Sequence, residues 1–316
     1  MSWMRRMRAD GRAVAGLLGL SFLWALSSLR GDLLPNLFPE AGGASLVGRV
    51  LPFALVALIA GIVAVMRRRT RPALRQVRDA ALASLSLFVA PAVLVHFAQA
   101  WVSDLTRVAL FSLVPFFAVV LEPHIGGDSH GPSRGGLTAA LIAVAGTLCV
   151  FPLDLPRSVE AAAAFFAVVG AAVCLAAANC WAVRIATEAE QGGAALAAIA
   201  AATAGVGSAG LALWTQRSMS GGGTMMPQLV WAVVVDLPAL LLLFWLMRRM
   251  SATRMTTRFL IAPLMTNLMD LALLRPVVSG RAGLGLVLVA GSAGWLLLAR
   301  EDEPEAGSTL LKLDGV

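Results

Sequence analysis

Residues 102–115 read VSDLTRVALFSLVP, and a related stretch, MSATRMTTRFLIAP, occupies residues 250–263. In both, the second residue is serine and the last is proline. A second match follows in each half, because LIAVAGT (141–147) resembles LVLVAGS (286–292). A Trp-Ala pair precedes them in each half, at Trp24-Ala25 and Trp181-Ala182. Three matches in one order predict that the chain contains two copies of one structural unit.

The sequence around these stretches is too apolar for a soluble protein. Apolar residues make up 59% of the 316 residues, charged residues only 14%, and the mean hydropathy is +0.81. Soluble domains carry roughly 25% charged residues, so we expect an all-α integral membrane protein. A helix needs about 20 apolar residues to cross the hydrocarbon layer. Ten stretches qualify: 13–30, 46–66, 80–101, 104–122, 136–151, 161–184, 193–214, 227–249, 256–274 and 281–299.

Ten spans divide into two repeats of five, at residues 13–151 and 161–299, with short tails at 1–12 and 300–316. Because five is an odd number, the second repeat must enter the membrane upside down relative to the first. The basic residues agree, since 18 of 25 fall on the side that holds both termini. The positive-inside rule then predicts a multi-pass protein of the cytoplasmic (inner) membrane with both termini in the cytoplasm. Because these cations lie at helix ends beside anionic lipid, no nucleic-acid partner is expected.

Inverted repeats are typical of transporters, in which the two halves exchange conformations around a site near the membrane midplane. At this point the chain resembles the EamA-type permeases of the drug/metabolite transporter superfamily. The resemblance rests on these segments: Phe22-Leu23-Trp24-Ala25, Ser103 to Pro115, Glu122-Pro123, ALIAVAGTL (140–148), and Arg248-Arg249-Met250-Ser251 running into Pro263. It implies two five-helix halves that move small organic metabolites, often outward.

Polar residues inside the spans are the candidates for a translocation site. Asp236 lies midway along its span, where a charged carboxylate costs about 2.5–3.5 kcal/mol and therefore needs a wet cavity or a partner. It either recognises a cationic group of the substrate, carries a proton, or forms a structural pair with an arginine. His96, Gln99 and Ser103 have the spacing of one helical face, which we expect to line the cavity. Asp236 and His96 are also the groups able to change charge within the membrane, which leaves proton-coupled transport open.

Four further residues complete the predicted site. Trp24 lies too deep for an interfacial tryptophan, so it either forms an aromatic wall of the cavity or packs in the bundle. Asn179 is a lone amide that either joins two helices or lines the path. Asn267 and Asp270 lie one turn apart, and Asp270 has pairing with Arg275 as its alternative role.

The function expected from these features is secondary transport of a small-molecule substrate by alternating access. The sequence has no phosphate-binding loop for ATP and no hydrolase motif, so neither a cofactor nor an enzymatic activity is expected. The cysteines, Cys149, Cys174 and Cys180, lack metal-ligand spacing, so no metal is expected either. The main alternative is a membrane assembly or regulatory subunit that transports nothing. An intramembrane enzyme is a lesser one.

Overall fold

The computed structural model describes residues 2–28, 46–67, 72–126, 133–151, 153–189, 192–215, 226–274 and 279–298. Every regular element in these ranges is a helix, which confirms the all-α class. The elements are α1 (Ser2–Ser28), α3 (Leu46–Met66), α4 (Leu74–Ser84), η1 (Leu85–Val89), α5 (Ala90–Ala98), α6 (Asp104–Phe111), α7 (Val114–Gly126), α8 (Arg134–Val150), α9 (Val159–Glu188), α10 (Gly193–Thr215), α11 (Met226–Trp231), η2 (Ala232–Asp236), α12 (Leu237–Leu246), α13 (Ala252–Thr256), α14 (Arg258–Leu274) and α15 (Gly280–Leu298).

Eight helical segments of the described chain are long and apolar enough to cross a membrane. They coincide with eight of the ten predicted spans, and they indicate a multi-pass membrane protein. The other two predicted spans contain α8 and α14, which have 17 residues each. At 1.5 Å per residue, such a helix measures about 25 Å, slightly less than the roughly 30 Å hydrocarbon layer.

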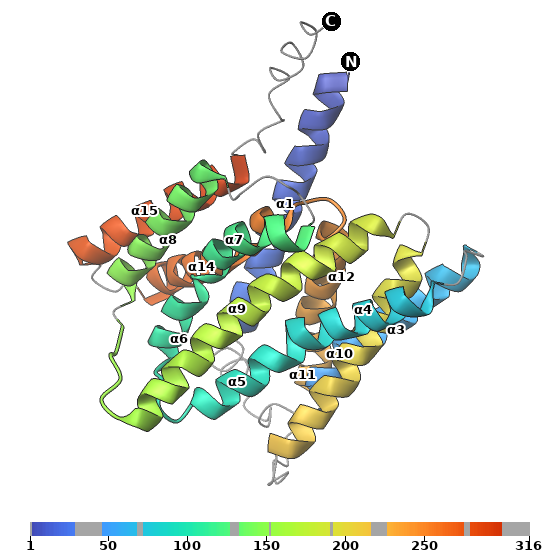
Figure 1. Cartoon of the computed structure of the whole chain (residues 1–316), viewed down its shortest axis with the longest axis horizontal. Helices are drawn as coiled ribbons and strands as arrows, with labels where there is room; N and C mark the ends of the chain where they lie inside the picture. Colours follow the sequence, from blue (N-terminus) through green and yellow to red (C-terminus); the bar gives the residue numbers. More distant parts are fainter. Residues whose placement is uncertain are drawn as a thin grey trace, which may run out of the picture.

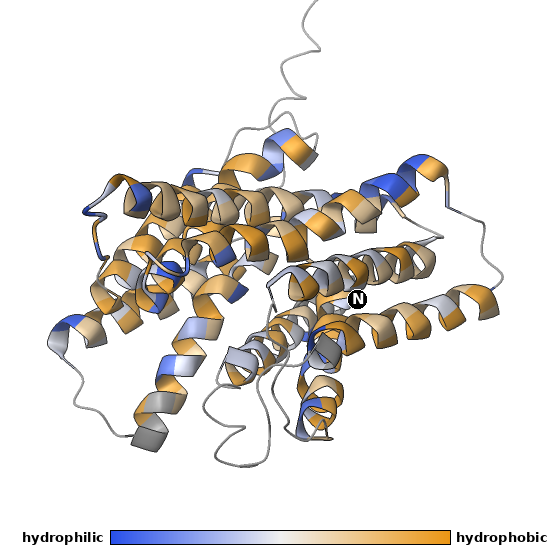
Figure 2. Ribbon diagram, turned by 90° about the horizontal axis from the view of Figure 1, so that it is seen from below, coloured by the Kyte–Doolittle hydropathy of each residue, from blue (hydrophilic) through white to orange (hydrophobic). Residues whose placement is uncertain are grey.

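The outer surface of the bundle has the apolar character that lipid contact requires. Large side chains such as Phe166, Val206 and Leu284 are exposed by 69%, 75% and 58%. Figure 2 shows hydrophobic residues along most of the ribbon, with many of the hydrophilic ones near helix ends. A soluble protein rarely leaves so many large apolar groups in water. On a surface that faces lipid, the same groups contact hydrocarbon and need no burial.

Two close helix pairs organise the bundle. α3 packs along α10, and α8 packs along α15, as Figure 1 shows. The second pair meets at glycines, because a Cβ added to Gly285 would lie 2.6 Å from the carbonyl oxygen of Gly146. The long helix α9 packs against α5 and α7, while α1 packs against α12 and α14.

Two of the spans contain a π-helical turn, which no sequence pattern had predicted. The turns are Leu85–Val89 and Ala232–Asp236, and in each the residue after the turn donates its backbone N–H to the carbonyl five residues earlier. Pro91 and Pro238 follow directly in the next turn of helix. Proline has no N–H to donate, so the regular ladder is already interrupted at these positions and a wider turn costs little extra.

The structure corrects two predicted boundaries. The third span ends at Ala98 instead of residue 101, and Ser103 caps the next helix, with its Oγ accepting from the backbone N–H of Thr106 at 3.3 Å. The prediction that His96, Gln99 and Ser103 share one helical face is therefore wrong for Ser103. The first helix also begins earlier than predicted. α1 starts at Ser2, so most of the residues predicted as an N-terminal tail (1–12) belong to this helix. The tail 300–316 lies outside the described residues.

Candidate functional site

A cavity of about 370 Å³ opens among α1, α3, α10 and the two spans that contain the π-helical turns. We call it the Asp236 cavity. Its volume is in the range of small-ligand pockets, about 300–1,000 Å³. The residues that give it chemical character are Trp24, Ser27, Arg49, Phe53, Phe88, Ser208 and Asp236.

Asp236 supplies the carboxylate of this cavity. It is the last residue of η2, and its side chain is half-buried. The hydroxyl of Ser27 on α1 donates a hydrogen bond to Oδ1 at 3.0 Å. The proline two residues later and the π-helical turn before it leave this stretch of backbone irregular, a feature often found where helices carry function. The prediction that Asp236 faces a cavity agrees with this placement.

Trp24 forms part of the cavity wall, and its ring packs against the partly buried Phe259 and the buried Arg258. The ring of Phe259 meets it edge to face, with the centroids 5.8 Å apart. The guanidinium of Arg258 lies 4.9 Å from the centroid of Trp24 and 4.8 Å from that of Phe259. Cation–π contacts of this kind gain strength when water is excluded, so the tryptophan is firmly held.

Arg258 is the most unusual residue of the bundle, because its side chain is only 1% exposed. Its Nη2 donates to Oδ1 of Asn179 at 2.7 Å, and its Nη1 donates to the carbonyl of Met255 at 3.1 Å. Its Nε has no hydrogen-bond partner. No carboxylate among the described residues forms an ion pair with it. A buried charge without a counter-ion is costly, and it favours negative charge in its surroundings.

The sequence pattern did not single out Arg258. Counting charges placed it with the arginines at the membrane surface, whereas the structure places it in the core beside Trp24 and Asn179. The sequence did contain a signal for the burial of Arg258, because residue 258 lies inside the predicted span 256–274. The lone amide Asn179 now has a role, since it is fully buried and joins α9 to α14 through this arginine.

Of the remaining predicted residues, the three whose side chains the structure describes, His96, Gln99 and Asn267, do not line the Asp236 cavity. The ring of His96 packs against Trp214 at 5.4 Å, and Gln99 is exposed beyond the end of α5. Asn267 donates from its amide nitrogen to the carbonyl of Pro263 at 2.8 Å, which satisfies a carbonyl of its own helix. The backbone of Asp270 belongs to α14, but its side chain lies outside the described residues.

A second cavity, of about 270 Å³, lies among α3, α4, α9, α10 and α12. We call it the Arg248 cavity. It is lined mainly by small and apolar residues, with Arg67 and Arg248 as its charged members. Phe88 of η1 lines both cavities, and it meets Phe53 of α3 edge to face at 5.0 Å. The Phe53–Phe88 pair therefore stands where the two cavities adjoin.

Comparison with known proteins adds information on the fold. No protein-family model matches the chain, and no curated protein matches it. A solved structure, described only as the crystal structure of a protein, is similar with a TM-score of 0.68 over 90% of this chain and 98% of that chain. The two share 16% sequence identity, so the similarity concerns the fold alone.

Proposed function

We propose that this chain is a secondary transporter that moves a small organic metabolite across a membrane by alternating access. The observation that carries the proposal is the pair of cavities that adjoin at Phe53 and Phe88. A carrier needs one compartment that is open to each side of the membrane and a barrier between them. The two cavities and the aromatic pair between them support such an arrangement.

Helix α3 gives the spacing of the two compartments. Arg49 near its start lines the Asp236 cavity, and Arg67 just beyond its end lines the Arg248 cavity. Eighteen residues of helix correspond to about 27 Å, close to the roughly 30 Å of the hydrocarbon layer. One cavity would therefore open toward each membrane surface.

Alternating access also needs two halves that can exchange conformations, and we propose ten spans in two inverted repeats of five. The π-helical turns support this reading, because their starts at Leu85 and Ala232 are 147 residues apart and a proline follows each. Ser103 and Ser251, both residues before a helix, are separated by a similar 148 residues. Helix packing supports it too, since α3 pairs with α10, α8 with α15, and the contacts of α1 with α12 and α14 correspond to those of α9 with α5 and α7.

Within this scheme, Asp236 is the proposed substrate ligand or proton carrier, and Trp24 is a wall of the site held by Arg258. Membership of the EamA-type permeases remains a prediction from the sequence motifs. So does the location in the cytoplasmic membrane with both termini inside.

The test begins with a search for a ligand. Purified protein is screened by thermal shift against a library of small metabolites, and each hit is repeated with Asp236→Asn and with Asp104→Asn. Asp104 is the matched control, because it is an exposed residue of α6 in an ion pair with Arg107 and lines neither cavity. A ligand at 100 times its Kd stabilises by about 2.7 kcal/mol. We expect this gain to disappear in Asp236→Asn alone.

The ligand found in this way is then used in a flux assay with the protein in liposomes. Net uptake that requires the protein supports transport, and acceleration by an imposed pH gradient that is absent in Asp236→Asn supports proton coupling. If a ligand binds but is never carried, the transport proposal is wrong, and the non-transporting membrane subunit becomes the better description.

A further inference from the structure

The Arg248 cavity combines an apolar interior with two arginines in its lining, Arg67 and Arg248. Ala80, Ala186, Ala197 and other small residues form its walls, and Phe244 and Trp245 add aromatic surface. Its volume of about 270 Å³ is close to the lower end of the range for small-ligand pockets, about 300 Å³. A compact apolar group fits such a space.

The guanidinium of Arg248 lies beside a glycine of α10. A Cβ added to Gly193 would lie 3.0 Å from Nη1 of Arg248, so the guanidinium rests directly against the start of α10. Arg67 approaches from the end of α3. Among the described residues, neither arginine forms a hydrogen bond or an ion pair through its side chain.

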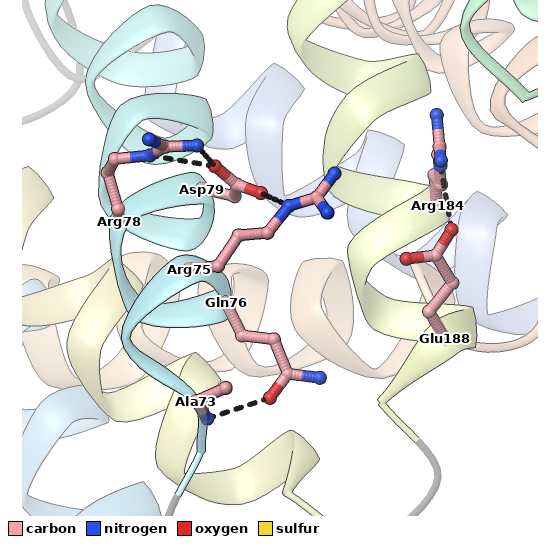
Figure 3. A network of polar contacts seen from close by, with 7 residues as sticks. All are labelled: Ala73, Arg75, Gln76, Arg78, Asp79, Arg184 and Glu188. Atoms are coloured by element: carbon pink, nitrogen blue, oxygen red, sulfur yellow. Dashed lines mark hydrogen bonds and ion pairs between the residues drawn. The ribbon is translucent and has the colours of Figure 1, made fainter.

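Two described acidic residues beside this cavity, Asp79 and Glu188, are already paired, as Figure 3 shows. Asp79 precedes a wall residue of α4, and its carboxylate lies 3.1 Å from Arg78 and 3.7 Å from Arg75. Glu188 is the last residue of α9, and its Oε1 lies 2.7 Å from Nε of Arg184. The positive charge of Arg67 and Arg248 is therefore not neutralised by the carboxylates drawn there.

Positive charge also dominates the rest of the proposed path. Arg49 lines the Asp236 cavity, and the buried guanidinium of Arg258 lies behind Trp24. Against these cations, Asp236 is the one acidic residue among the described residues that line the two cavities. A carboxylate or another small anionic head would meet an arginine in each compartment, and Asp236 would then act as the proton carrier and not as the substrate ligand.

We propose that the Arg248 cavity binds a soluble amphipathic anion, with its apolar group between α4, α9 and α10 and its anionic head at Arg67 and Arg248. This inference rests on the proposed function in one respect, since it takes the bound anion to be the transported class. The site itself is a binding site whether or not transport follows.

The experiment uses the full chain in phosphatidylcholine nanodiscs and two probes, phenylbutyrate and the uncharged phenylbutanol, with binding measured by titration calorimetry. We expect phenylbutyrate to bind more tightly than phenylbutanol.

The double variant Arg67→Gln/Arg248→Gln should weaken the binding of phenylbutyrate by about tenfold and leave the binding of phenylbutanol unchanged. Ala197→Phe should weaken both by filling the cavity. Arg134→Gln, an exposed arginine at the start of α8 away from the cavity, is the matched control and should change neither.

Several outcomes would overturn the proposal. Equal affinity for the two probes, or an unchanged affinity in the double variant, would show that the arginines do not bind the head. Nanodiscs that contain phosphatidylglycerol should leave the affinity unaltered, and loss of phenylbutyrate binding there would identify a lipid headgroup site instead. The flux assay separates this inference from the proposed function. Transport of a cationic substrate would refute the inference that the transported class is anionic, but not the transport proposal. Binding of phenylbutyrate without any flux would refute the transport proposal, but not the anion site.

Discussion

The crossing of α8 and α15 allows a quantitative prediction for Gly285→Ala. The new Cβ would lie 2.6 Å from the carbonyl oxygen of Gly146, 2.7 Å from Cγ2 of Val150 and 2.9 Å from Cβ of Cys149. A carbon and a carbonyl oxygen approach no closer than about 3.3 Å without strain, so the helices must separate by about 0.7 Å. Such overpacking costs about 1–3 kcal/mol, against which alanine returns at most about 1 kcal/mol in helix propensity.

The matched control is Gly283→Ala on the same helix, because its new Cβ would meet nothing within 4 Å. This variant should be as stable as the natural protein or up to about 1 kcal/mol more stable. Reversible unfolding in mixed micelles, followed by circular dichroism, measures both free energies. Because both variants gain the same helix propensity, we expect Gly285→Ala to be less stable than Gly283→Ala by the overpacking cost, about 1–3 kcal/mol. Equal stabilities would refute the close glycine crossing.

Three further variants test other contacts by the same unfolding measurement. Asn179→Leu removes the acceptor of a buried guanidinium and should cost about 1.5–3 kcal/mol, so a neutral result would mean that this hydrogen bond does not matter. Glu122→Gln weakens the carboxylate that accepts from two backbone N–H groups at the start of α13, at 2.7 and 3.0 Å, and should cost about 1–2 kcal/mol. The exposed Glu188→Gln should change nothing by comparison. Gly207→Ala would place its Cβ 2.6 Å from Cγ2 of Val89 and 2.9 Å from Cδ2 of Leu85. Because valine has little rotamer freedom, this variant should cost about 1–3 kcal/mol, while the open Gly210→Ala should cost nothing.

The sequence predicts what a single helix encodes. Apolar length located eight spans that the structure bears out, and the position of Asp236 inside its span pointed to a cavity. It also predicted an aromatic wall or packing role for Trp24, which takes part in both. These features follow from hydropathy and depth in the span, which need no knowledge of the neighbouring helices.

Contacts between helices that are distant along the chain could not be predicted from the sequence. The partner of Arg258 is 79 residues away on α9, and no local pattern links the two. The third span illustrates a second limit. Its π-helical turn adds a residue, which rotates the rest of the helix by about 100° relative to a regular one. From this span Phe88 and Ala92 line the Asp236 cavity, while His96 packs on Trp214.

The inverted arrangement depends most of all on α8, whose 17 residues make it one of the two short predicted spans. If α8 crosses the membrane, Gly126 before it and Leu155 after it lie on opposite sides. Single cysteines at these two positions, in a protein whose own three cysteines are replaced by alanine, can be labelled with a membrane-impermeant maleimide from either side. We predict that Gly126→Cys reacts only from one side and Leu155→Cys only from the other. Reaction of both from the same side would leave an even number of crossings in the first half, and the two halves could not be inverted copies.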